Sequence, residues 1–150
     1  MKTKIPPPLW LLIAGAVMWL AAHSVVALPF ALPYASVMLV AFVACGVLTG
    51  LLALRQFRSA QTTVNPLKPQ EATALVRTGI FSKSRNPMYL GLLLILIGWA
   101  VWLGAMINVL VLILFVVVLT ELQIKPEEAA LRKLFGQEYE DYCQQVRRWL

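Results

Sequence analysis

The chain has 150 residues, of which 60% are hydrophobic and 13% are charged, and its mean hydropathy is +0.76. Soluble domains carry about 25% charged residues, so this composition excludes an ordinary soluble domain and predicts an integral membrane protein with a single compact domain. The net charge of +6 does not indicate nucleic-acid binding, because the basic residues lie beside apolar runs, where they set the orientation of membrane helices.

The N-terminal half is apolar and free of charge over a run of 50 residues between Lys4 and Arg55. One membrane helix needs about 20 residues, so the run must fold back once. Two prolines, Pro29 and Pro33, predict the reversal. We expect membrane spans over residues 9–28 and 34–54. A secretory signal is the alternative for the first run, but the run is a full span long and leads directly into another.

Two glycines of the second expected span, Gly46 and Gly50, are spaced so that another helix can approach closely. The partner helix can belong to the same chain or to a second copy. The oligomeric state therefore stays open.

A polar segment follows and is expected to form a cytoplasmic loop over residues 55–87. Between Arg55 and Arg85 it holds six basic residues against the single acid Glu71. Positive charge of this kind marks the cytoplasmic side of a membrane protein.

The next apolar run, Leu90 to Thr120, has 31 residues without a charge. A straight helix of that length would measure roughly 46 Å, too long for a hydrocarbon core of about 30 Å. A helical hairpin fits better, with its apex at residues 104–108 and spans over residues 88–104 and 106–124. The chain then crosses four times, both termini are cytoplasmic, and all 13 basic residues lie on one side. In a bacterium this would be the inner membrane.

The polar tail is predicted to be an amphipathic helix over residues 126–149. Pro126 suits a first helical turn, and Glu127 and Glu128 follow it where negative charge is favoured. Apolar and aromatic residues then recur at spacings of three and four from Leu131 to Trp149. Gly136 is expected either to bend this helix or to end a first segment of it.

The hairpin should return these two glutamates to Arg85, with Tyr89 and Phe81 nearby. Carboxylates, an arginine and aromatic faces together suit a zwitterionic or cationic ligand. Helix capping and contacts with lipid headgroups are the alternative explanation of the same residues. No metal site is predicted.

The paired motifs resemble those of the isoprenylcysteine carboxyl methyltransferase family and of the related phospholipid N-methyltransferases. The resemblance covers residues 62–149 and rests on Leu75-Val76, Gly79-Ile80-Phe81, Arg85-Asn86-Pro87-Met88-Tyr89-Leu90-Gly91, Glu127-Glu128, Leu131, Phe135-Gly136, Tyr139, Tyr142, Val146 and Trp149. It implies an integral membrane enzyme that binds S-adenosylmethionine from the cytoplasm and takes a lipid-like or small apolar acceptor from the bilayer.

The resemblance also implies roles for individual residues. Arg85 is expected to orient cofactor or acceptor, and Gln123 to contact the acceptor. The expected cofactor-binding residues are Thr73, Ala74, Leu75, Val76, Phe81, Asn86, Pro87, Met88, Tyr89, Glu127 and Glu128.

Two positions depart from the family pattern. Asn86 stands where histidine is frequent, and an amide can still hydrogen-bond there. Gln123 stands where eukaryotic members have an arginine that contacts the substrate, so binding of a prenylated cysteine carboxylate would need another cation, such as Lys125 or Arg85.

Three functions therefore remain open. The reaction that the resemblance favours most is carboxyl O-methylation of an isoprenylcysteine. The second is N- or S-methylation of a phospholipid or small molecule. The third is a non-catalytic membrane scaffold with the same fold. Transport is disfavoured because the first two spans carry no charged residue.

Overall fold

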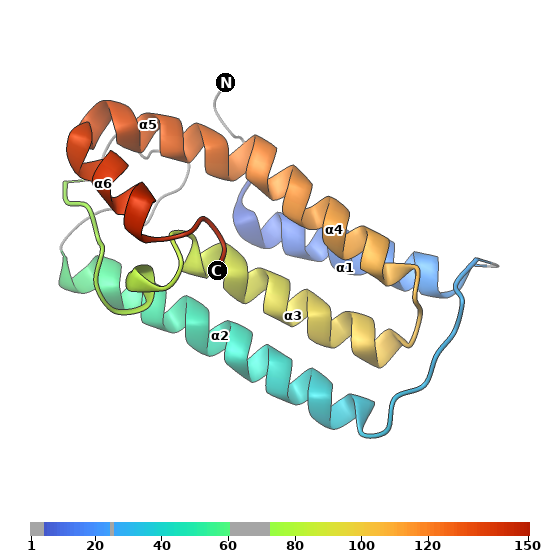
Figure 1. Ribbon diagram of the computed structural model, residues 1–150. Helices are drawn as coiled ribbons and strands as arrows, with labels where there is room; N and C mark the ends of the chain where they lie inside the picture. The colour runs from blue at the N-terminus through green and yellow to red at the C-terminus, as the bar shows by residue number, and fades with distance from the viewer. Residues whose placement is uncertain (1–4, 25, 61–72) are drawn as a thin grey trace.

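The computed structural model describes residues 5–24, 26–60 and 73–150, and these residues form a helical bundle (Figure 1). Within them the only β-type pairing is one isolated bridge between Pro29 and Ala105. The prediction of an all-helical fold is confirmed. In chain order the elements are α1 (Pro7–Ala22), α2 (Ala35–Ser59), the 3-10 helix η2 (Gly79–Ser82), α3 (Pro87–Leu103), α4 (Asn108–Leu119), the π-helical segment η3 (Thr120–Ile124), α5 (Lys125–Phe135) and α6 (Gln137–Gln145).

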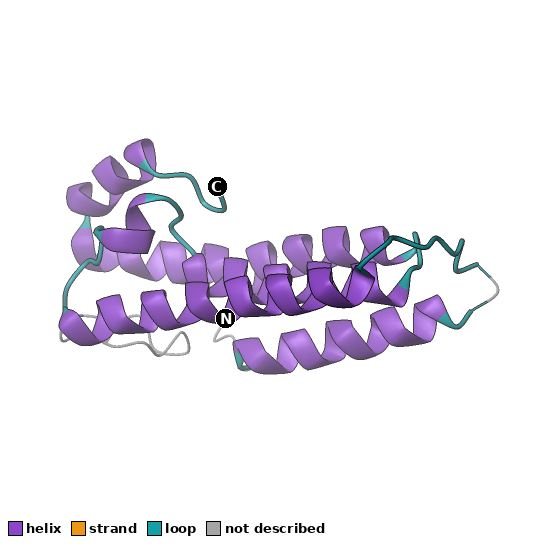
Figure 2. Cartoon of the chain, turned by 90° about the horizontal axis from the view of Figure 1, so that it is seen from below, coloured by secondary structure: helices purple, strands orange, loops and turns teal. Residues whose placement is uncertain are grey.

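The long helices α1 to α4 lie along one another, and α3 packs against α1, α2 and α4 (Figure 1). Helices α5 and α6 gather at the end of the bundle where α2 ends and α3 begins (Figure 1). Seen from below, the C-terminus lies on one side of the bundle and the helix that follows the N-terminus lies on the other (Figure 2).

Among the described residues, two helices are long and apolar enough to cross a membrane: α2, and the continuous helix Asn108–Phe135 that joins α4, η3 and α5. Helices α1 and α3 are also apolar but have only 16 and 17 residues. Large apolar side chains, such as Leu12, Leu48 and Leu110, are more than half exposed on the bundle surface. A soluble monomer rarely exposes so much apolar surface, which favours a location in lipid.

Prolines and glycines set the ends of the helices near the predicted positions. Pro7 and Pro87 occupy the first turns of α1 and α3, where a missing N–H costs no helical hydrogen bond. Gly104 ends α3 with φ +62°, and α4 begins at Asn108, so the hairpin apex lies where the sequence predicted it. The first helix ends at Ala22 rather than at residue 28, and α2 continues to Ser59. Residues 61–72 of the expected loop lie outside the described residues.

The two connections at the far end of the bundle satisfy each other's backbone groups. The N–H of Phe30 donates to the carbonyl of Gly104 at 2.8 Å, and the N–H of Met106 donates to the carbonyl of Leu28 at 3.1 Å. Unpaired backbone groups are costly near lipid, so this pairing explains how two uncharged turns can lie side by side there.

The tail helix predicted over residues 126–149 is present in two parts, α5 and α6, and ends four residues early. No break separates α4 from α5, because η3 winds as a π-turn where the ring of Pro126 would otherwise press on the carbonyl of Leu122. The break falls instead at Gly136, whose φ of +53° suits glycine and separates α5 from α6. The helical path then ends at Gln145, and Val146 is extended.

Glycines bring α2 and α3 into close contact within the chain. A Cβ added to Gly46 would lie 2.5 Å from the carbonyl oxygen of Gly91, and one added to Gly91 would lie 2.6 Å from that of Gly46. At Gly50 an added Cβ would meet nothing within 4 Å. Of the two glycines noted in the sequence, Gly46 therefore makes the close approach.

We expect Gly46→Ala to destabilise the fold by about 1–3 kcal/mol, because the new methyl group overlaps a backbone oxygen of α3. Gly50→Ala makes the same change on the same helix and should be neutral or slightly stabilising, because alanine favours a helix. Thermal unfolding in detergent measures both. Equal melting temperatures for the two variants would show that the contact between α2 and α3 is not this close.

Candidate functional site

The candidate site lies where the basic corner (residues 79–91) meets the acidic start of α5 and the C-terminal segment (residues 146–150). The basic corner contains η2, a short connection and the first turn of α3. The hairpin between α3 and α4 carries the chain away and the continuous helix Asn108–Phe135 carries it back, which places α5 over the corner (Figure 1).

The first contact between these elements is a hydrogen bond from the hydroxyl of Tyr89 to Oε1 of Glu127, at 2.5 Å. Tyr89 lies in the first turn of α3 and is buried, with 4% of its surface exposed. Burial raises the pKa of Glu127; the Tyr89 hydrogen bond lowers it in part, and the nearby charge of Glu128 raises it further. A buried carboxylate with a high pKa is a group able to take up a proton near neutral pH.

The second contact is an ion cluster centred on Glu128. Nη2 of Arg85 lies 3.1 Å from Oε1 of Glu128, and the two side chains are only 9% and 3% exposed. Arg148 binds the same carboxylate with two hydrogen bonds, of 2.9 Å from Nε and 2.7 Å from Nη2. Arg85 therefore pairs with Glu128, whereas Glu127 pairs with Tyr89.

Two effects oppose each other in the pKa of Glu128. Burial raises it, but the Arg148 hydrogen bonds and the charges of Arg85, Arg148 and Arg132 lower it more. A carboxyl whose pKa is lower in the folded state stabilises the fold above its unfolded pKa of about 4.3, and the contribution is lost as the pH falls through the folded value. The cluster is thus complete at neutral pH.

The C-terminal segment is tied to the corner by backbone groups as well. The N–H of Arg85 donates to the carbonyl of Arg147 at 3.0 Å, and Nδ2 of Asn86 donates to the carbonyl of Arg148 at 2.9 Å. Nε1 of Trp149 reaches Oγ1 of Thr120 at 3.2 Å. Sequence reasoning missed Arg148. The sequence placed two carboxylates opposite a single arginine, so one acid lacked a counter-charge. That missing charge is the signal that could have led to a second arginine.

The other predicted cofactor residues surround the corner. Phe81 and Val76 are buried against α2 together with Met88, and Phe81 meets Phe57 edge to face at 5.0 Å between ring centroids. The carbonyl of Phe81 accepts a 2.7 Å hydrogen bond from the hydroxyl of Tyr142. Leu75, another predicted cofactor residue, packs against the cluster of Tyr139 and Tyr142 in α6. The predicted residues Thr73 and Ala74 come directly before Leu75 in the chain. Pro87 is fully buried.

Gln123 is not in contact with Arg85. It is buried in η3, where its Nε2 donates to the carbonyl of Ile5 at 2.7 Å, just before α1. Lys125, the other cation considered for a carboxylate acceptor, forms an exposed ion pair with Glu121.

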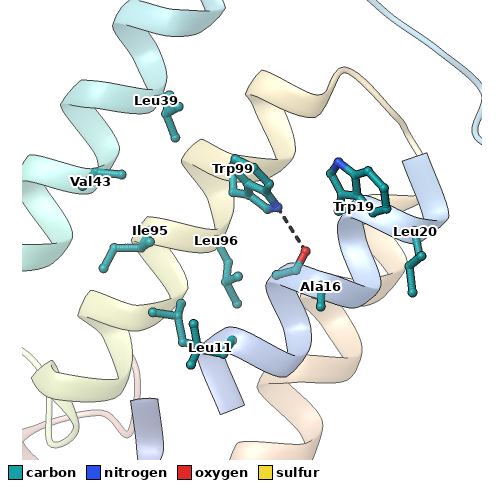
Figure 3. Close-up of a pocket in the computed structure, with 11 residues that line it drawn as sticks. Leu11, Ala16, Trp19, Leu20, Leu39, Val43, Ile95, Leu96 and Trp99 are labelled. Atoms are coloured by element: carbon teal, nitrogen blue, oxygen red, sulfur yellow. Dashed lines mark hydrogen bonds between the residues drawn. The ribbon is translucent and has the colours of Figure 1, made fainter. Parts of the chain in front are cut away.

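An apolar pocket of about 570 Å³ lies between α1, α2 and α3 (Figure 3). Leu11, Trp19, Leu39, Ile95, Leu96 and Trp99 are among its lining residues. Nε1 of Trp99 donates to the carbonyl of Gly15 at 3.2 Å and links α3 to α1. Leu96 also belongs to the buried cluster that contains Tyr89, and Leu11 packs against that cluster. The pocket therefore adjoins the core beneath the candidate site.

We expect Glu128→Gln to lower the free energy of unfolding by about 3 kcal/mol or more, because it leaves buried Arg85 without its counter-charge. Glu138→Gln is the matched control, since Glu138 meets Nη2 of Arg77 at the same 3.1 Å but both side chains are about half exposed. Its cost should be about 0–1 kcal/mol. Thermal unfolding in detergent compares the two, and similar losses would show that burial of the Arg85 pair is unimportant.

Comparisons with known proteins identify the family. A family model described as phospholipid methyltransferase matches residues 34–138, more than half of the chain. An uncharacterized protein of Haemophilus influenzae is 51% identical over 63 residues, which are 42% of this chain and 100% of that protein. No solved structure matches the chain. The family match includes α2, α3, α4 and α5, and with them the basic corner and the two glutamates, whereas the C-terminal segment with Arg148 lies beyond it. The chain belongs to the phospholipid methyltransferase family.

Proposed function

We propose that the chain is an integral membrane methyltransferase that uses S-adenosylmethionine and modifies an apolar or amphipathic acceptor taken from the bilayer. The observation that carries this proposal is a pair of contacts in a chain of a methyltransferase family: the part-buried hydrogen bond between Tyr89 and Glu127 and the buried ion pair between Arg85 and Glu128. Packing alone seldom explains adjacent buried acids at the polar end of an apolar bundle, because burying charge is costly.

In this proposal the chain crosses the membrane four times, with α1, α2, α3 and the apolar part of the continuous helix as spans. Both termini and the candidate site then face the cytoplasm, which in a bacterium means that the protein lies in the inner membrane. The basic residues support this orientation, because 2 precede α1, 6 lie between Arg55 and Arg85, and 5 follow residue 124. Helices of 16 and 17 residues are at the short end of what a span requires.

The side chains present fit S-adenosylmethionine. Glu127 offers a carboxylate to amino or hydroxyl hydrogens, and Nε of Arg85 is buried with no partner among the described residues, so it can donate to a carboxylate. Tyr89 and Phe81 offer aromatic faces to a positive centre. We assign cofactor binding to these residues together with the predicted neighbours Thr73, Ala74, Leu75, Val76, Asn86, Pro87 and Met88. Glu128 serves the site by holding Arg85 in place.

When bound, S-adenosylmethionine supplies a methyl group whose bond to sulfur breaks, with the electron pair staying on sulfur, as the acceptor's lone pair binds the carbon. The chain's own residues align the reactants. A dry site favours transfer to an anionic acceptor, because the positive charge of the sulfonium and the negative charge of the acceptor cancel; with a neutral amine the positive charge passes from sulfur to nitrogen. A carboxylate acceptor needs no base. An amine acceptor must lose a proton, and Glu127, with its raised pKa, is the group at the site suited to receive it.

The apolar pocket supplies the route for the acceptor. Its walls carry only apolar side chains and backbone, and it adjoins the cluster that contains Tyr89. An acceptor with a hydrocarbon chain could lie in the pocket and present its polar end to the candidate site. The chemistry of that polar end distinguishes a phospholipid amine from an isoprenylcysteine carboxylate. Membranes incubated with cofactor carrying a labelled methyl group would reveal which one is modified.

A non-catalytic scaffold of the same fold is the second candidate. An exposed, half-paired site would favour it, but Tyr89, Glu127 and Glu128 are all engaged, and Tyr89 and Glu128 are buried. Absence of methylated product with every acceptor, despite intact folding, would support the scaffold.

We expect Glu127→Ala and Tyr89→Phe to weaken binding of S-adenosylmethionine by tenfold or more, because each removes one partner of a buried hydrogen bond at the cofactor site. Isothermal titration calorimetry in detergent measures the affinity. Glu121→Ala is the control, since Glu121 is an exposed acid on the same continuous helix. If the two site variants bind as tightly as the unchanged chain, these assignments are wrong.

We expect Ala16→Phe to fill part of the apolar pocket and to raise the KM for a long-chain acceptor several-fold, with cofactor affinity unchanged. Val17→Phe adds the same ring at the next position of α1, which does not line the pocket, and should leave the KM unaltered. Methyl incorporation at varied acceptor concentration gives both values. A normal KM for Ala16→Phe would place the acceptor elsewhere.

A further inference from the structure

Trp10, near the start of α1, carries a buried indole N–H that has no hydrogen-bond partner among the described residues. A buried tryptophan N–H usually finds a partner, because a donor that is removed from water and left unpaired costs free energy. A ligand that supplies an acceptor to this N–H would therefore be favoured.

Each of the other four tryptophans either has a partner or is exposed. The indole N–H groups of Trp99 and Trp149 donate to oxygen atoms of the protein, both at 3.2 Å. Trp19 and Trp102 are 48% and 46% exposed, as is common for tryptophans that contact the membrane and its interface. Contact with the membrane does not explain Trp10, because its N–H is inaccessible from outside the protein.

Trp10 lies between the apolar pocket and the candidate site. It packs against the cluster that contains Tyr89 and Leu96, and Leu96 also lines the pocket (Figure 3). The next residue, Leu11, packs against the same cluster and lines the same pocket. If an acceptor has its chain in the pocket and its polar end near Glu127, the junction between the two falls near Trp10.

A hydrogen bond holds the start of α1 near the site. The carbonyl of Ile5 accepts this bond from Nε2 of Gln123 at 2.7 Å, and Gln123 precedes Glu127 by about one helical turn. The family match begins at residue 34, so α1 lies outside it. Trp10 is thus a feature of this chain that the match does not include.

The chemistry of an indole N–H limits the ligand. It is only a donor, so the ligand must offer an acceptor, which neither an ammonium group nor a hydrocarbon chain can do. A glycerophospholipid carries ester carbonyl oxygens at the boundary between its headgroup and its chains. These oxygens are uncharged, so burying one against a neutral donor leaves no charge unpaired.

We propose that Trp10 is a specificity-determining residue whose Nε1–H donates to an ester carbonyl of a glycerophospholipid acceptor. The inference rests on the proposed function and adds the substrate class to it. Trp10 selects an ester-linked lipid over its ether-linked counterpart, in which a CH2 group replaces the carbonyl. It also selects against an isoprenylcysteine, which has no ester between its chain and its polar end.

The test is competition between ester-linked and ether-linked phosphatidylethanolamine for the full chain in detergent, with the bound lipid identified by native mass spectrometry. The two lipids share headgroup, charge and chain length and differ at the carbonyl groups. We expect the unchanged chain to prefer the ester-linked lipid by about threefold to tenfold, the range of one hydrogen bond. Equal binding of the two lipids would overturn the inference.

Two matched variants assign the preference to Trp10. Trp10→Phe removes the N–H and keeps an aromatic ring, so the preference should disappear. Trp102→Phe makes the same change at an exposed position of α3 and should retain it. A preference that persists in Trp10→Phe would overturn the inference. Thermal unfolding checks that both variants fold, and if Trp10→Phe does not, the comparison of the two lipids on the unchanged chain still tests the inference.

Cofactor calorimetry and methyl transfer separate this inference from the proposed function. If the unchanged chain prefers the ester but does not bind S-adenosylmethionine, the proposed function fails and Trp10 still recognises a lipid ester. If cofactor binds normally and the preference is absent, the inference fails alone. Equal kcat/KM for methyl transfer to the two lipids, beside a preference in binding, would place the ester on a lipid that is not the acceptor and would also overturn the inference.

Discussion

The arrangement of the molecule depends on the buried ion pair between Arg85 and Glu128. It joins the connection before α3 to the helix that returns after the hairpin, two segments more than 40 residues apart in the chain. Arg148 adds the C-terminal segment to the same carboxylate. An isolated charge would be very unfavourable at 3% exposure, so each of the three groups requires the others in place. The Tyr89–Glu127 hydrogen bond lies beside this cluster and shares its support.

Polar and apolar chemistry are separated along the bundle. The charged cluster lies at one end, the backbone pairing between Phe30 and Gly104 lies at the other, and an apolar pocket lies among the helices between them. An amphipathic molecule has the same division, with a polar head and an apolar chain. The chain belongs to a family described as phospholipid methyltransferase, and in the function proposed above this division would let one small protein hold both a lipid and a water-soluble donor.

Much of this arrangement could be predicted from sequence because it follows from length and charge. A charge-free run of 31 residues is too long for one crossing, which gave the hairpin and its apex at Gly104. The meeting of Arg85 with the two glutamates followed from that hairpin. The details that could not be predicted depend on tertiary contacts: Arg148 reaches Glu128 only because the chain leaves its helix after Gln145. Likewise the amide nitrogen of Gln123 donates to the carbonyl of Ile5, 118 residues away.

The π-turn at Thr120–Ile124 fixes how far the returning helix is rotated when it reaches the end of the bundle that holds the charged cluster. Each residue of an α-helix turns the chain by about 100°, so inserting or deleting one residue between Gly104 and Glu127 would swing both carboxylates away from Tyr89 and Arg85. The number of residues between Gly104 and Glu127 is therefore set by the direction in which the carboxylates must point, as well as by the thickness of the bilayer. A thicker or thinner membrane would have to be matched by tilt of the whole bundle, because the segment between Gly104 and Glu127 cannot gain or lose residues without turning the carboxylates away.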